Sequence, residues 1–426
     1  MRPSLLTLAL LSLLGLGLQA TAGPGDLSRG DEAATPQNPV AALQARLRAG
    51  QVTLDHDEDG GYLASVLRHL KVPVSSQGFV FSRTSLQRSR ISPKTPRALY
   101  FNDEVTVGYC LRGDALEIAA ADPNLGTVFY TVDQDPAREG AIVRQGETCL
   151  MCHGSTANQG LPGHLIRSVF PDRVGDPVLA RGMKRVDHTT PFAERWGGWY
   201  VTGTSGRQQH LGNKCFDRNG EPKEDEGVNV TDLKPYFTVG NYLSPHSDLV
   251  ALLVLEHQCE CHNRLARANL FTRAALAEQA ELNRTVGKPL GEKRPDIARR
   301  IHGACEPLVE CLLYSDEAPL REPVAGTSDF AKEFTARGPF DSHRRSLREF
   351  DLKTRIFRYP LSYLIYTGVF DGLPAEAKER VYLRLWEVLT GKDRSRPFAH
   401  LSAGDRQAVL QILRETKKGL PAYWTR

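Results

Sequence analysis

Two cysteines and a histidine stand close together in the first half of the chain, in the string CLMCH at residues 149–153. Two thiols three positions apart on one turn can each add to a vinyl group of the same porphyrin, and the imidazole that follows can bind the iron as the proximal ligand. This spacing is the attachment signature of c-type haem. The sequence therefore predicts one haem c, held by thioethers from Cys149 and Cys152 and ligated by His153.

Two other kinds of site use the same pair of thiols. A structural zinc site requires a second C-x-x-C or a suitably spaced pair of histidines, and we find neither nearby. A thioredoxin-like redox motif lies at the start of a helix that follows a strand. Here Gly146 and Gly154 bracket the motif, and no βαβ pattern surrounds it. Haem attachment is therefore the favoured interpretation.

The ligand on the opposite side of the iron decides between an electron carrier and a protein that binds small molecules. Met183 is the leading candidate, because the other two methionines lie at the first position and inside the attachment turn. His188, five positions further on, and His257 are alternatives, and His164 follows the motif closely. His257 lies on the apolar side of a predicted helix, where a hydrogen-bonded core histidine is the other interpretation.

The remaining cysteines are expected to form disulfides, since the chain has the features of an exported protein described below. Six cysteines allow fifteen pairings, and bridges between the two predicted helices that carry four of them are one hypothesis. The other is a metal site. On a helix Cys259 and Cys261 point about 200 degrees apart, whereas His257 and Cys261 share a face. The six cysteines are Cys110, Cys215, Cys259, Cys261, Cys305 and Cys311.

Residues 1–22 have the features of a secretory signal peptide. Arg2 provides a positive start, residues 5–18 form an apolar run rich in leucine, and the string ATA at 20–22 is a small-x-small cleavage site. We therefore expect an exported protein, periplasmic or extracellular, with a flexible lead-in at 23–38. No later stretch approaches the length of an apolar span, so we expect no membrane span after signal cleavage.

Length and composition restrict the partners. The chain has 426 residues, with 54 Lys and Arg against 50 Asp and Glu, and loss of Arg2 with the signal leaves 53 basic residues. So small an excess over this length does not indicate nucleic acid, and docking must use local patches. One basic stretch could pair with haem propionates, dock an anionic redox partner or simply be solvated: Arg83, Arg88, Arg90, Lys94 and Arg97.

The elements that must position the motif form an α+β pattern. Short helices are predicted at 40–47 and 62–70, before an antiparallel β meander at 104–111, 115–121 and 127–132. Residues 136–245 are rich in glycine and proline, so irregular structure is expected around the haem.

Longer helices are predicted in the second half of the chain. One starts at Ser247 and need not end before Gly287, a second covers 296–314, and others follow at 375–390 and after Ser402. We therefore expect a haem-bearing α+β region at 39–325 and a helical region at 326–426.

Through Cys149, Cys152 and His153 the chain resembles the c-type cytochromes. The strings RWGGWYVTG at 195–203 and LEHQ at 255–258 also resemble a group of secreted monohaem bacterial proteins with a cytochrome c domain. The first resemblance implies electron transfer with a redox partner protein, and the second implies no activity and no catalytic residue. The alternative expectation is a haem enzyme or small-molecule binder, peroxidase-like or sensing, with an open distal face. We expect a carrier rather than a catalyst.

Overall fold

The computed structural model describes residues 34–158, 160–216, 222 and 226–425. The predicted signal peptide and the first part of the lead-in lie outside these residues. The last part of the lead-in is anchored: the backbone N–H of Gln37 donates to Asp122, and the Asn38 side chain caps the first described helix.

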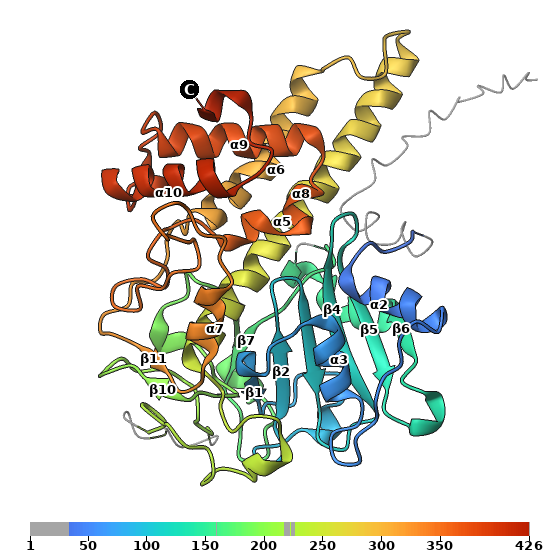
Figure 1. Cartoon of the computed structure of the whole chain (residues 1–426), viewed down its shortest axis with the longest axis vertical. Coiled ribbons are helices and arrows are strands. Elements are labelled where there is room, and N and C mark those ends of the chain that lie inside the picture. Colours follow the sequence, from blue (N-terminus) through green and yellow to red (C-terminus); the bar gives the residue numbers. More distant parts are fainter. Residues whose placement is uncertain (1–33, 159, 217–221, 223–225, 426) are drawn as a thin grey trace, which may run out of the picture.

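A seven-stranded antiparallel sheet forms the lower part of the molecule in Figure 1. It confirms the predicted α+β class and the meander, whose three predicted strands correspond to β3, β4 and β5. The strand order is β6 (Ile142–Gln145), β5 (Gly126–Asp133), β4 (Ala115–Asp122), β3 (Val105–Tyr109), β2 (Arg97–Phe101), β1 (Gly78–Val80) and β9 (Trp199–Tyr200).

The two faces of this sheet pack against different elements, as the alternation of side chains along a strand requires. In β2, Ala98 and Tyr100 belong to the core that includes the short helices α2 (Pro39–Arg48) and α3 (Leu63–Leu70). Leu99 and Phe101 point the other way, into the core built on helix α5 (Leu249–Thr285). The sheet is thus covered by helices on both sides (Figure 1).

The long predicted helix is confirmed as α5, which has 37 residues. Asp248 caps it, because its Oδ1 accepts hydrogen bonds from the backbone N–H groups of Val250 and Ala251. Helix α6 (Pro295–Leu312) packs against α5 and against α9 (Ala375–Leu389). This arrangement places the buried middle of α5 between the sheet and the C-terminal helices.

The C-terminal region is helical only in part. It contains α7 (Phe330–Ala336), α8 (Gly368–Asp371), α9 and α10 (Ala403–Thr416), and the predicted capping box of Ser402 and Asp405 is present at the start of α10. Between α7 and Tyr363 the chain forms turns instead of helix. Side chains such as Asp351, which accepts the backbone N–H groups of Thr354 and Arg355, compete there with helical hydrogen bonds.

Two small antiparallel pairs complete the fold. Strands β7 (Arg167–Val169) and β8 (Met183–Arg185) pair within the glycine- and proline-rich segment, and β10 (Gly203–Thr204) pairs with β11 (Ala325–Gly326). The predicted boundary between residues 325 and 326 falls inside β11, and one hydrophobic core contains residues from both sides of it.

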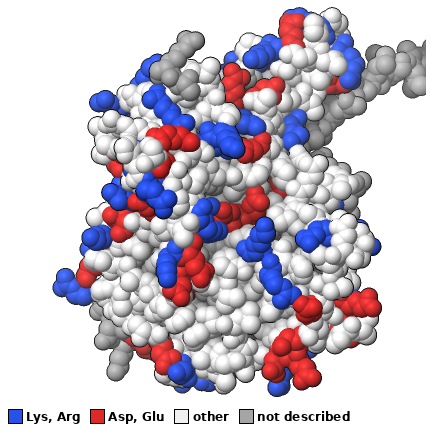
Figure 2. All heavy atoms as spheres, viewed as in Figure 1, with Lys and Arg blue, Asp and Glu red and all other residues white. Residues whose placement is uncertain are grey.

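Among the described residues, no helix is long and apolar enough to cross a membrane. The face of the molecule in Figure 2 carries Lys and Arg interspersed with Asp and Glu, without a broad area of one sign. A docking partner on this face would therefore meet small local patches of charge.

Candidate functional site

The attachment motif lies on a short helix, α4 (Glu147–His153), directly after edge strand β6. Cys149 and Cys152 are three positions apart on this helix, so both thiols project from about one turn. None of the residues of α4 is buried, and Met151 is 75% exposed. Every strand pairing in the sheet before it is antiparallel, so α4 does not belong to a βαβ unit of the thioredoxin kind.

A cavity of about 550 Å³ opens beside α4. All three predicted haem residues, Cys149, Cys152 and His153, line it. Its volume lies within the range of about 300–1,000 Å³ that is usual for cofactor and small-molecule sites. The wall is largely apolar and comes from one face of the sheet, the segment at 164–167 and α5, with Leu99, Phe129, Ile166, Trp199 and Leu255.

One ring nitrogen of His153 is engaged in a hydrogen bond. Its Nδ1 lies 2.9 Å from the carbonyl oxygen of Gly163, to which the Nδ1–H donates. Burial lowers the pKa of His153, which favours the neutral imidazole. In that form Nε2 carries a lone pair. The carbonyl thus fixes the tautomer that metal-binding histidines use.

The loop that supplies this carbonyl is tied to both neighbouring helices. Asn158 donates from Nδ2 to the carbonyl oxygens of His153 and His164, at 3.0 and 3.2 Å. Asn263 on α5 accepts the backbone N–H of His164 at 2.8 Å and donates back to its carbonyl oxygen at 3.0 Å. The position of the imidazole therefore depends on α5, more than a hundred residues along the chain.

Replacing Gly163 by alanine is expected to destabilise the protein by about 1–3 kcal/mol, the usual range for overpacking. A Cβ at this position would lie 2.3 Å from the Oδ1 of Asn263, and Asn263 cannot turn away without losing both bonds to His164. Urea unfolding measures the effect. Gly240→Ala is the matched control, because a Cβ there meets nothing within 4 Å, and it should change stability by less than about 0.5 kcal/mol. Equal stability of the two variants would contradict the packing argument.

Part of the predicted basic stretch lines the same cavity. Arg83, Arg88 and Arg97 are joined there by Arg167 from β7, against one carboxylate, Glu117. Arg83 pairs with Asp176 at 3.2 Å and Arg97 with Glu117 at 2.6 Å, so the positive excess of the wall comes from Arg88 and Arg167. This excess suits a group with two carboxylates such as haem.

Arg97 is the most constrained of these arginines. Its Nη2 lies 2.6 Å from Glu117 Oε2, whereas its buried Nε has no hydrogen-bond partner among the described residues. The side chain crosses Gly108, where a Cβ would lie 2.3 Å from the same Nη2. An unpartnered buried donor beside the cavity is an available hydrogen bond for an anionic ligand.

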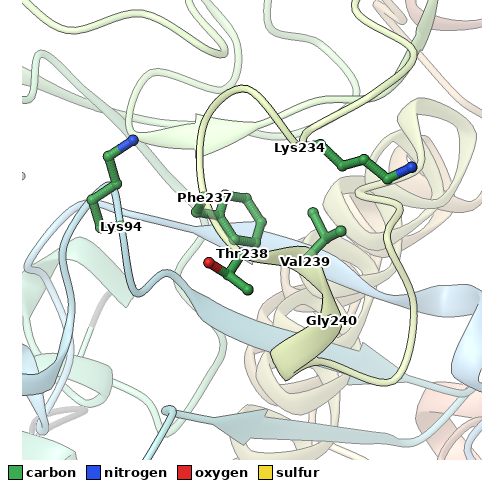
Figure 3. A pocket seen from close by; sticks show the side chains of 6 residues that line it. All are labelled: Lys94, Lys234, Phe237, Thr238, Val239 and Gly240. Carbon is green, nitrogen blue, oxygen red and sulfur yellow. The ribbon is translucent and has the colours of Figure 1, made fainter.

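The other two residues of the basic stretch face elsewhere. Arg90 pairs with Asp114 at 2.9 Å, and Lys94 donates to the carbonyl oxygen of Tyr236 at 2.5 Å. Lys94 lies at the edge of a separate pocket of about 390 Å³, with Lys234 and the turn at 237–240 (Figure 3). The basic stretch is thus divided: Arg83, Arg88 and Arg97 line the cavity, Lys94 lines the separate pocket, and Arg90 lines neither.

The structure does not bring the three predicted distal ligands to the cavity. Met183, on β8 opposite Val169, is 52% exposed and does not line it. His188 and His257 are fully buried but contact each other, with 3.4 Å between their Nδ1 atoms, and neither lines it.

His164 is the histidine that lines the cavity together with His153. It is buried, its Nε2 has no hydrogen-bond partner among the described residues, and burial holds its pKa well below the usual value. Cys259 also lines the cavity, four positions after Leu255 on α5, whereas Cys261 does not. The predicted opposition of Cys259 and Cys261 is therefore confirmed.

From the sequence, His164 was one of the histidines that compete with Met183 for the distal position, whereas Phe129, Arg167 and Cys259 had no predicted role at the cavity. Alternation along the strand at 127–132 was a signal for Phe129, because it faces opposite to the core residue Val128. Arg167 offered no such signal, since its place depends on how an irregular segment folds back onto the sheet.

No protein-family model matches the chain, and no curated protein or solved structure matches it either.

Proposed function

We propose that the protein is an exported monohaem c-type cytochrome that carries electrons. The observation that supports this most is the wall of the cavity: the two thiols and the imidazole of the motif face the same apolar space as four arginines. Each part of a haem has a matching group there, since the ring is apolar, the vinyl groups require thiols, the iron requires a neutral imidazole and the propionates require cations.

The roles of the residues follow from their positions. Cys149 and Cys152 would hold the group covalently, and His153 would bind its iron through Nε2 while Gly163 keeps Nδ1–H engaged. Arg97 and Arg167 would bind the propionates. Bound haem c supplies a one-electron couple between ferric and ferrous iron.

The exposure of α4 favours a carrier. Cys152 and Met151 are exposed, so the attachment turn lies where a partner protein can approach it. Electron exchange between proteins requires such access, because the protein around the group insulates it. We propose a redox partner protein that docks at α4 through local patches, in the periplasm or outside the cell.

A second candidate function is the binding of a small molecule at an open distal face, as in a sensor or a peroxidase-like enzyme. It is favoured by the placement of Met183, His188 and His257, none of which lines the cavity. Among the described histidines, His164 is the one that remains for the sixth position in a carrier.

Absorption spectra separate the two candidates. The protein is produced in a host that matures c-type haem, and ferric and ferrous spectra are recorded with and without carbon monoxide. A low-spin spectrum that carbon monoxide does not change supports the carrier, and loss of that spectrum in His164→Ala would assign the sixth ligand. A high-spin ferric form that binds carbon monoxide when reduced supports the second function. Absence of haem from the protein refutes both.

A further inference from the structure

A second group of metal-binding side chains lies on the opposite side of α5 from the cavity. His188, His257 and Cys311 each offer a ligand atom within 4.8 Å of the others. A fourth donor, Cys261, borders this group through Cys311: its Sγ lies 3.1 Å from Cys311 Sγ but is not among the donor atoms that lie within 4.8 Å of one another. We propose that these four residues bind one zinc ion, separate from the haem.

The fold brings the four donors together from three elements. His257 and Cys261, one turn apart on α5, face the same way, and Cys311 comes from the end of α6, which packs along α5. His188 lies in the connection after β8, and its carbonyl oxygen accepts a hydrogen bond from buried Arg195 at 3.0 Å. All four side chains are buried, so water does not compete for their donor atoms.

The donor set selects the metal. Two imidazoles and two thiolates form the ligand set of many structural zinc sites, and two thiolates neutralise Zn²⁺, so the buried site would carry no net charge. Tetrahedral zinc with its usual bond lengths places two nitrogens about 3.3 Å apart and two sulfurs about 3.8 Å apart. The two Nδ1 atoms are 3.4 Å apart, which fits, and the two sulfurs would have to separate slightly.

The residues around the four donors make contacts that are typical of metal sites. His257 Nε2 lies 2.8 Å from the hydroxyl of Ser362, which can accept the Nε2–H and leave the Nδ1 lone pair for the metal. The ring of Tyr314 stacks on His257 with 4.1 Å between centroids and shields that side.

Unsatisfied polar atoms also gather here. Among the described residues, His188 Nε2 and Tyr314 Oη are buried without a hydrogen-bond partner. A zinc ion held by the two Nδ1 atoms would contact neither of these atoms, so their partners must be other groups, such as a buried water. A disulfide between Cys261 and Cys311 is the competing interpretation, and it would leave the two Nδ1 atoms of His188 and His257 facing each other at 3.4 Å. Cys261 and Cys311 are separate thiols in the structure.

The experiment measures zinc in the haem-loaded protein by elemental analysis, with iron as the internal count of haem. We expect about one zinc per chain, lost in His257→Gln and in Cys311→Ser. Cys305→Ser is the matched control, because Cys305 is a buried cysteine of the same helix outside the cluster, and it should keep the zinc.

Cobalt substitution of the wild-type protein does not depend on variants that fold. After chelation and addition of Co²⁺, thiolate-to-cobalt charge-transfer bands and the intense visible bands of a tetrahedral ion are expected. Zinc that persists in both cluster variants overturns the proposal. So does a wild-type protein without zinc in which non-reducing peptide mapping finds Cys261 joined to Cys311. Neither result depends on whether haem is bound.

Discussion

Protein in which Cys149 and Cys152 are both replaced by alanine is expected to contain no covalent haem and to remain folded. The thioethers require both sulfurs, and the cavity would then hold the group only by ligation and apolar contact. Since none of the residues of α4 is buried, the two substitutions themselves remove little packing, and the unfolding free energy should differ by less than about 1 kcal/mol from that of wild-type protein without haem.

Only covalently attached haem stays with the protein on a denaturing gel, where its peroxidase activity can be stained. The intensity of the stained band therefore measures covalent attachment. Either single variant should keep one thioether and a weaker stain, with a shifted ferrous spectrum because one vinyl group stays unreacted. Met151→Leu is the matched control inside the motif, since Met151 is exposed, and it should stain as the wild type does. Full staining of the double variant would refute attachment at this motif.

The fold was predictable where local pattern and burial agree. In the strand at 115–121, alternate residues such as Leu116 and Ile118 enter one core, which is the period of a half-buried strand. The long helix was predictable because Asp248 supplies a cap and no proline or glycine follows for more than thirty residues. The turns at 337–362 were not predictable from local pattern, because aspartate side chains and tertiary contacts determine them.

Of the candidate site, only the three motif residues and part of the basic stretch were predicted from the sequence. The motif is local, so its residues lie together whatever the rest of the chain does. The distal ligand is not local: Met183 stands in a suitable segment, yet its pairing with Val169 in a small hairpin leaves it half exposed. His188 and His257 were candidates as single residues, and their contact with each other depends on how the connection after β8 crosses α5.

The second large effect, on the free energy of unfolding, is expected from a buried ion pair next to the contact between His188 and His257. Arg195 donates from Nη1 to Glu256 Oε2 at 2.6 Å, from Nε to the carbonyl oxygen of Thr190 at 2.8 Å and from Nη2 to that of His188 at 3.0 Å. Both charged side chains are only 2% exposed. Arg195→Met should therefore lower the unfolding free energy by about 3–5 kcal/mol, since it leaves Glu256 buried without its counter-ion.

The loss should depend on pH in a defined direction. Burial raises the pKa of Glu256 to about 7, with Arg195 opposing the rise, whereas the group has its ordinary value of about 4.5 in the unfolded chain. Because the pKa is higher in the folded state, the folded state binds the proton more tightly than the unfolded chain does. The contribution of Glu256 to stability therefore falls as the pH rises through about 7. Without Arg195 the pKa rises further, so the variant should lose more stability at pH 8 than at pH 5.

The double variant Arg195→Met/Glu256→Gln tests the cause of that pH dependence. It has no carboxylate to ionise at position 256, so its own unfolding free energy should lack the fall between pH 5 and pH 8 that Glu256 causes in the wild type and in Arg195→Met, and its stability should exceed that of Arg195→Met at pH 8. Urea unfolding of the wild type and the two variants at the two pH values provides the six free energies needed. A pH-independent loss in Arg195→Met would mean that the carbonyl bonds to Thr190 and His188, not the charge of Glu256, account for the stabilisation by Arg195.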